Sequence, residues 1–147
     1  MKRLHAENGA ALVEMAIVTP VLLLVLAGIA EFGLMFRAYE VTTNAAREGV
    51  RLAALPGNEE NDYAIVRTRV EAYLSDAALP GARTIAVTPE SVALGALSAN
   101  GARVTVTYTY QCQFLGPAVA LMNGTFTNTI TFQSGAVMRT EIAAVGP

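Results

Sequence analysis

The sequence is poor in the side chains that most enzymes and metal sites use. Its 147 residues include one cysteine, one histidine and only 15% charged residues. A single thiol, Cys112, cannot form an intramolecular disulfide, and no metal-binding motif can be assembled around it. We expect Cys112 to behave as a small buried apolar residue, with an intermolecular disulfide as the alternative.

The only histidine, His5, lies close to the N-terminus, so the rest of the chain has none. Serine and cysteine triads use a histidine as their base, and zinc sites mostly use histidine or several cysteines. A glycine-rich phosphate loop is also absent. We therefore expect no enzyme activity, no cofactor and no metal site.

The net charge of the chain argues against nucleic acid as a partner. Ten basic and twelve acidic residues give a net charge of −2, which provides no basic surface for a phosphate backbone, so nucleic acid is disfavoured. Apolar residues make up 53% of the chain, and their excess is concentrated near the N-terminus. This length and this distribution indicate one small domain and a membrane anchor.

The anchor is predicted between Ala10 and Ala30, a stretch whose single charge is Glu14. As a helix it would be about 31 Å long, close to the hydrocarbon thickness of a bilayer. Lys2 and Arg3 precede it, so the positive-inside tendency places the N-terminus in the cytoplasm and the chain after residue 37 outside.

Glu14 is the unusual residue of this stretch, because a carboxylate deep in a bilayer costs about 3 kcal/mol even on lenient insertion scales. One interpretation is that its position near the cytoplasmic edge lets it reach the headgroups. The other is that a peptidase cuts after Gly9, which makes Ala10 a new N-terminal amine. Ala10 and Glu14 are i and i+4 on one helix face, so the amine and the carboxylate could neutralise each other.

Residues 9–14, Gly-Ala-Ala-Leu-Val-Glu, resemble a type IV prepilin cleavage motif, with a short basic leader before them and an apolar helix after them. Residues 11–20, 28–33 and 43–51 closely resemble the TadE-like family, whose members are minor pilins or pseudopilins of the tight-adherence (Flp) pilus system. The resemblance covers about the first third of the chain.

What the resemblance implies is a non-enzymatic subunit, cleaved between Gly9 and Ala10 by a prepilin peptidase, with Glu14 serving processing and assembly. Its expected partners are that peptidase, membrane lipid, other pilin-like subunits and the inner-membrane pilus platform, in a homo- or hetero-oligomer. The expected location is the bacterial inner membrane, crossed once, with a periplasmic C-terminal domain, or the outside of the cell within a pilus.

Two rival interpretations stay open. In the first, the apolar stretch is a secretory signal, with Gly28 and Ala30 as the small residues before a cut and Glu31 as the mature N-terminus. In the second, the chain is an uncut, membrane-tethered binding module whose threonine-rich sheet faces the periplasm.

The N-terminal helix is predicted to continue beyond the membrane to about Leu55, where Pro56 and Gly57 end it. Pro20 removes one helical hydrogen bond and should bend or loosen the helix locally. Further along, Arg47, Glu48 and Arg51 have two interpretations. They either pair within the chain, on a helix whose small residues allow close packing, or form a subunit-docking surface.

The remaining residues predict a second helix over residues 61–78 and an antiparallel sheet. The expected strands cover residues 84–88, 92–97, 103–113, 125–133 and 135–143, with a tight turn at Asn100-Gly101. Residues 114–122 are predicted to form either a buried crossover or a surface that contacts a partner. The fold class is therefore α+β and pilin-like. Its expected parts are a leader (1–9), a transmembrane half-helix (10–36) and an extracytoplasmic head (37–147).

Overall fold

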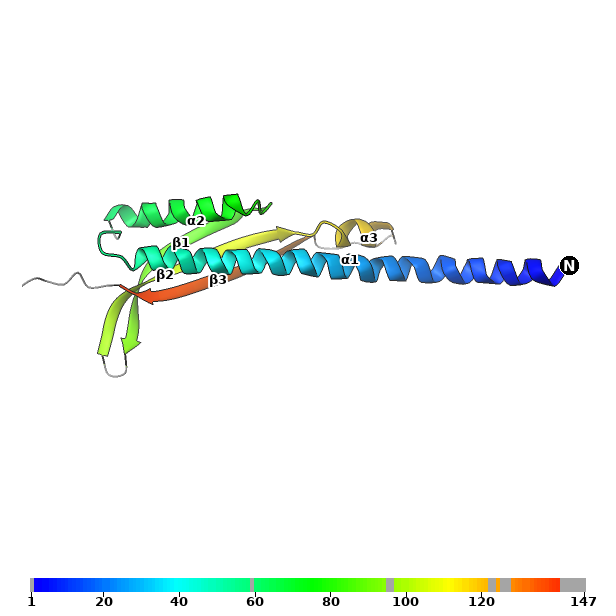
Figure 1. Ribbon diagram of the computed structural model, residues 1–147, viewed down its shortest axis with the longest axis horizontal. Helices are drawn as coiled ribbons and strands as arrows, with labels where there is room; N and C mark the ends of the chain where they lie inside the picture. The colour runs from blue at the N-terminus through cyan, green and yellow to red at the C-terminus, as the bar shows by residue number, and fades with distance from the viewer. Residues whose placement is uncertain (1, 59, 95–96, 122–123, 125–127, 141–147) are drawn as a thin grey trace, which may run out of the picture. The chain divides into compact units, whose positions relative to one another are not determined.

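The computed structural model describes residues 2–58, 60–94, 97–121, 124 and 128–140. In chain order, its elements are α1 (Lys2–Ala53), the 3-10 helix η1 (Glu60–Tyr63), α2 (Ala64–Asp76), β1 (Arg83–Leu94), β2 (Leu97–Gln111), α3 (Leu115–Leu121) and β3 (Thr129–Arg139) (Figure 1). They form two compact units, one of Met1–Leu34 with Cys112–Asn128 and one of Met35–Gln111 with Thr129–Pro147. We call them the anchor unit and the sheet unit.

The predicted α+β class is confirmed, with a long apolar N-terminal helix, a second helix and a three-stranded antiparallel sheet. α1 begins at Lys2, so the predicted leader is part of the same helix, and it continues through Pro20. By length and composition, α1 is the helix of the described chain that can cross a membrane. The local bend predicted at Pro20 stays a prediction.

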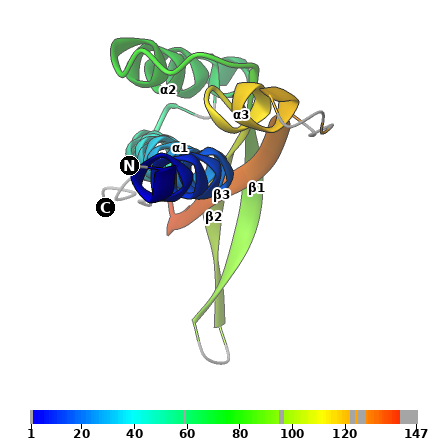
Figure 2. The same cartoon turned by 90° about the vertical axis from the view of Figure 1, so that its right-hand side faces the viewer.

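The core of the sheet unit lies on one face of β2. Val104, Val106, Tyr108 and Tyr110 alternate along the strand and are buried, as the sequence predicted, while threonines between them are only partly covered. Two helical segments lie over the buried face: α2 and the C-terminal part of α1 (Figure 2). α2 contributes Val66, Val70 and Leu74 to this core.

Small residues of α1 set how closely these layers approach. Ala45, Ala46 and Ala53 are fully buried. At Gly49 a Cβ atom would lie 2.5 Å from Cγ2 of Val70 and 3.2 Å from Cγ1 of Val104. Gly49 therefore marks the point where α1, α2 and β2 meet, and its lack of a side chain makes that contact possible.

The prediction of a tight turn at Asn100-Gly101 is wrong. Both residues lie inside β2, where Asn100 pairs with Ser91 and Gly101 with Glu90. A Cβ atom at Gly101 would lie 2.6 Å from the carbonyl oxygen of Met138, so the glycine gives the backbone of β3 room to approach. β1 and β2 instead stay paired as far as Leu94 and Leu97, and this paired part extends past Gly101, where the pairing of β2 with β3 ends (Figure 2).

The number of strands was also overestimated. Predicted strand 84–88 and residues 92–94 of predicted strand 92–97 belong to one strand, β1, which runs through Pro89, while residues 95–96 lie outside the described residues and Leu97 begins β2. β1 is at the edge of the β1-β2-β3 sheet, where a residue without a backbone N–H is tolerated. Likewise β3 continues through Gly135, and the predicted strand residues 125–127 and 141–143 lie outside the described residues.

The predicted second helix is shorter than expected at both ends. Asp62 and Tyr63 have positive φ angles, so the chain enters α2 only at Ala64, after η1. At the other end, Ala78 also has a positive φ angle, and the helix stops at Asp76. The apolar stripe that predicted the helix is nevertheless the buried face of α2.

The packing at Gly49 gives a prediction for stability. Gly49→Ala should lower the free energy of unfolding by about 1 kcal/mol, because overpacking costs about 1–3 kcal/mol while the better helix propensity of alanine returns about 1 kcal/mol. Thermal unfolding of the full chain in detergent, followed by circular dichroism, measures the change.

The matched control for that substitution is Gly33→Ala on the same helix. No atom lies within 4 Å of a Cβ atom built at Gly33, so this variant should be neutral or slightly more stable. Equal stability of the Gly49→Ala and Gly33→Ala variants would contradict the close packing at Gly49.

Candidate functional site

The most constrained polar group of the anchor unit is the carboxylate of Glu31, which is only 6% exposed. Its Oε1 accepts a hydrogen bond from the backbone N–H of Gln113 at 3.0 Å. Its Oε2 accepts two more, from the N–H groups of Phe114 at 2.7 Å and Leu115 at 2.9 Å. One side chain of α1 thus binds three consecutive backbone groups of a turn 82–84 residues downstream.

The local sequence explains why these N–H groups need a partner. β2 ends at Gln111, and α3 begins at Leu115. The first N–H groups of a helix have no acceptor within the helix, and a buried unsatisfied group costs about 1–3 kcal/mol. Hydrogen bonds to an ionised carboxylate are also stronger than neutral ones. Glu31 therefore holds the turn before α3 against α1.

Apolar contact continues this attachment along α1. Cδ1 of Leu115 would lie 3.7 Å from a Cβ atom at Gly28, so the two elements touch one turn before Glu31. Leu24, Ala27 and Gly28 are partly covered, whereas residues 9–23 of α1 are exposed. These covered residues and Glu31 recur at helical spacing, so α3 lies along one face of α1 (Figure 1).

Cys112 precedes this turn and is a buried free cysteine, 5% exposed, as predicted for a small apolar residue. Its backbone N–H donates a hydrogen bond of 2.9 Å to the carbonyl oxygen of Asn128. Burial raises the pKa of the Cys112 thiol, and the negative charge of Glu31 raises it further. The thiol is therefore protonated and poorly reactive at neutral pH.

The predicted cleavage residues lie on the exposed N-terminal part of α1. Gly9, Ala10 and Glu14 are all exposed, and Ala10 and Glu14 are one helical turn apart. The structure thus places them on one helix, as expected. Cleavage itself, and the role of Glu14 in it, stay predictions.

The residues predicted to contact other subunits divide into two groups. Glu48 pairs with Arg51 within the chain, with Nη2 of Arg51 3.1 Å from Oε1, and it also lies 3.8 Å from Nη2 of Arg69 on α2. The hydrogen bond from Arg51 is the main cause that lowers the pKa of Glu48, and the charge of Arg69 adds to it. Arg47, in contrast, is exposed on another face of α1.

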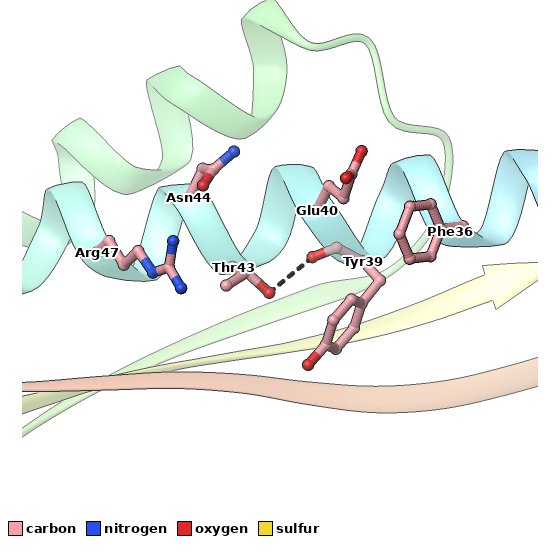
Figure 3. Close-up of a pocket in the computed structure, with 6 residues that line it drawn as sticks. All are labelled: Phe36, Tyr39, Glu40, Thr43, Asn44 and Arg47. Atoms are coloured by element: carbon pink, nitrogen blue, oxygen red, sulfur yellow. Dashed lines mark hydrogen bonds between the residues drawn. The ribbon is translucent and has the colours of Figure 1, made fainter.

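That face of α1 forms a shallow depression, shown in Figure 3, whose lining includes Arg47. The hydroxyl of Thr43 donates a 2.8 Å hydrogen bond to the carbonyl oxygen of Tyr39. The Tyr39 ring packs edge-on against Phe132 of β3, with centroids 5.7 Å apart. The lining residues are Phe36, Tyr39, Glu40, Thr43, Asn44 and Arg47. A subunit contact through Arg47, Glu48 and Arg51 stays a prediction.

Within the described part of the chain, no group of three or more histidine, cysteine, aspartate or glutamate side chains could hold a metal ion. The depression in Figure 3 has one acidic and one basic side chain, Glu40 and Arg47, and offers no nucleophile beside a base.

Comparison with known proteins identifies the N-terminal third of the chain. The sequence profile of the family described as TadE-like protein matches residues 9–51. Residues 9–51 are a TadE-like segment. Neither a curated protein nor a solved structure matches the chain significantly.

The TadE-like segment begins at Gly9 and includes Glu14, Pro20, Glu31 and the residues from Arg47 to Arg51. The resemblance inferred from the sequence is confirmed for these residues. The sequence did not predict the hydrogen bonds of Glu31, because the residues that it binds lie far along the chain and outside the TadE-like segment.

The Glu31 contacts predict the reactivity of Cys112. In Glu31→Ala the turn at residues 113–115 loses its acceptor, and the thiol loses a neighbouring negative charge that raises its pKa. Both effects should speed alkylation of Cys112 by iodoacetamide near pH 8 relative to the wild-type chain. The rate in detergent is measured by mass spectrometry.

A matched control is Glu40→Ala, which removes an exposed glutamate of the same helix and should leave the rate of Cys112 alkylation unchanged. Amide hydrogen exchange at Gln113, Phe114 and Leu115 should increase in the Glu31 variant alone. Unchanged alkylation and unchanged exchange in Glu31→Ala would show that the carboxylate does not hold this turn.

Proposed function

We propose that this chain is a minor pilin or pseudopilin of a tight-adherence pilus, cleaved after Gly9 by a prepilin peptidase. The observation that carries the proposal is the TadE-like segment, which starts at Gly9 and holds the anchor and Glu14. The chain's role is to prime or join pilus assembly, and it is structural rather than catalytic.

The arrangement of charges supports anchoring of α1 in the inner membrane. The basic residues Lys2 and Arg3 precede the mostly exposed apolar stretch from Ala10 to Ala30. The only charged residue within that stretch is Glu14. This pattern favours a cytoplasmic N-terminus and a single crossing. In the proposed organisation, residues 1–9 are the leader, residues 10–36 cross the membrane, and residues 37–147 lie in the periplasm or in the pilus.

Cleavage would give Glu14 a partner. The new amine of Ala10 has an ordinary pKa near 8, so it carries a positive charge at neutral pH. One helical turn separates it from the Glu14 carboxylate, and pairing of the two lowers the cost of holding that carboxylate in lipid. The same pair can form between neighbouring subunits, which links cleavage to assembly.

Exposed side chains of α1 supply the surface for packing against other pilin helices. Large apolar residues of its membrane half, among them Leu12, Ile17 and Leu26, are more than half exposed. Further along the helix, the depression of Figure 3 offers two charged side chains, Glu40 near the aromatic ring of Phe36 and Arg47 at the opposite end. Assembly into an oligomer would cover both surfaces.

The first test of this function is the mature N-terminus. Gly9→Lys should block cleavage, because the bulky charged side chain occupies the position before the cut, so the protein keeps its full-length mass. The wild-type chain should begin at Ala10. Intact-mass measurement of the protein purified from membranes of cells that carry the pilus system decides between the two.

Asn8→Lys is the matched control for this experiment, because it adds the same charge to the leader without changing the residue before the cut. It should be cleaved like the wild type. A wild-type chain that remains uncut would favour the membrane-tethered binding module, and a start at Glu31 would favour a secretory signal.

Glu14→Gln tests the second part of the proposal. The change keeps the size of the side chain and removes its charge, so membrane anchoring should persist. Loss of the ion pair should lower recovery of the protein with other pilin subunits several-fold, as measured by crosslinking followed by immunoblotting. Glu7→Gln, in the leader that is removed, should have no effect, and equal recovery of both variants would contradict a role for Glu14 in assembly.

A further inference from the structure

The anchor unit holds a second apolar element besides α1. We propose that α3, together with Phe114, is embedded in the outer edge of the bilayer beside α1, with its exposed face on lipid acyl chains. The inference rests on the proposed membrane anchoring of α1. It depends neither on cleavage after Gly9 nor on assembly into a pilus.

Contacts with α1 fix the depth of α3. Leu115 touches α1 at Gly28, inside the stretch between Ala10 and Ala30 that is predicted to cross the membrane. Glu31, which binds the turn before α3, is the next residue after that stretch. With a rise of about 1.5 Å per residue, Gly28 lies about 4.5 Å deeper than Glu31. If the apolar stretch up to Ala30 occupies the hydrocarbon core, and residues 31–36 of the proposed span lie among the headgroups, the start of α3 is at the level of the hydrocarbon edge.

The free face of α3 has the chemistry of a lipid contact. Phe114 is 47% exposed, and Pro117 and Ala120 follow at intervals of three residues, so all three lie on one exposed apolar face. No charged residue occurs in the sequence between Arg103 and Arg139. α3 contacts α1 at Gly28, and α1 carries the exposed apolar side chain of Ile29 at the next position, so the bilayer would cover apolar side chains of both elements at this level.

Several backbone groups at the start of α3 have the partners that a bilayer requires. Polar backbone groups in hydrocarbon must find partners within the protein, because no water is present to bind them. Glu31 accepts the N–H groups of residues 113–115, and the N–H of Ala118 donates to the carbonyl oxygen of Phe114 at 3.0 Å. The Glu31 carboxylate thus makes the entry of this turn into an apolar environment feasible.

The chain contains no tryptophan, so one introduced tryptophan reports its own surroundings. Phe114→Trp and Ala120→Trp place the reporter at two points of the proposed lipid face. Ile17→Trp reports an exposed position inside the predicted span, and Ile65→Trp reports an exposed position on α2. Each full-length variant is reconstituted into phosphatidylcholine vesicles whose acyl chains are brominated near the headgroup or near the terminal methyl group.

Emission from the Phe114→Trp and Ala120→Trp variants should be blue-shifted and quenched, most strongly by the lipid brominated near the headgroup. The Ile17→Trp variant should be quenched most by the deeply brominated lipid, and the Ile65→Trp variant by neither. This pattern is the expected result.

Three other outcomes would overturn the proposal in distinguishable ways. Emission from Phe114→Trp that resembles that of Ile65→Trp, while Ile17→Trp is quenched, would place α3 in water although the anchor holds. A blue shift without quenching would indicate that protein, such as a second subunit, covers the face. Absence of quenching in Ile17→Trp would refute the anchoring of α1, and the proposed function with it.

Discussion

The hydrogen bonds between the Glu31 carboxylate and three backbone N–H groups organise the anchor unit. Without them, three part-buried N–H groups of the turn that follows β2 would lose their acceptor, and α3 would lose its polar attachment to α1. The apolar contact of Leu115 at Gly28 adds to this attachment but lacks direction. The carboxylate therefore determines which segment of the later chain belongs with the first 34 residues.

The same helix meets two different requirements along its length. Between residues 9 and 23 its side chains are exposed on every face and mostly large and apolar, as suits a helix surrounded by lipid. Between Ala45 and Ala53 its buried positions are mostly alanine and glycine, which bring α2 and β2 close to its backbone. Glu31 lies between these stretches and belongs to neither pattern. The composition of α1 thus changes with the partner that each part must contact.

Much of the fold could be predicted because it depends on local patterns. The apolar run after residue 10, the helical stripe of α2 and the alternation from Val104 to Tyr110 each indicated the right element. The prediction of a turn at Asn100-Gly101 was wrong because glycine is also used where a neighbouring backbone comes close. Gly101 makes room for β3, and the sequence alone does not distinguish this use from a turn. The role of Glu31 could not be predicted, since its three partners are backbone groups, which are identical at every residue except proline.

The distance in sequence between Glu31 and the turn that it binds has a consequence for synthesis. At about 5–20 residues per second, roughly 4–17 s pass between translation of Glu31 and translation of Leu115. During that interval α1 exists, but the groups that bind the Glu31 carboxylate do not. If α1 inserts into the membrane as proposed, the nascent helix holds Glu31 without these partners, and the final arrangement of the anchor unit can form only after most of the chain has been made.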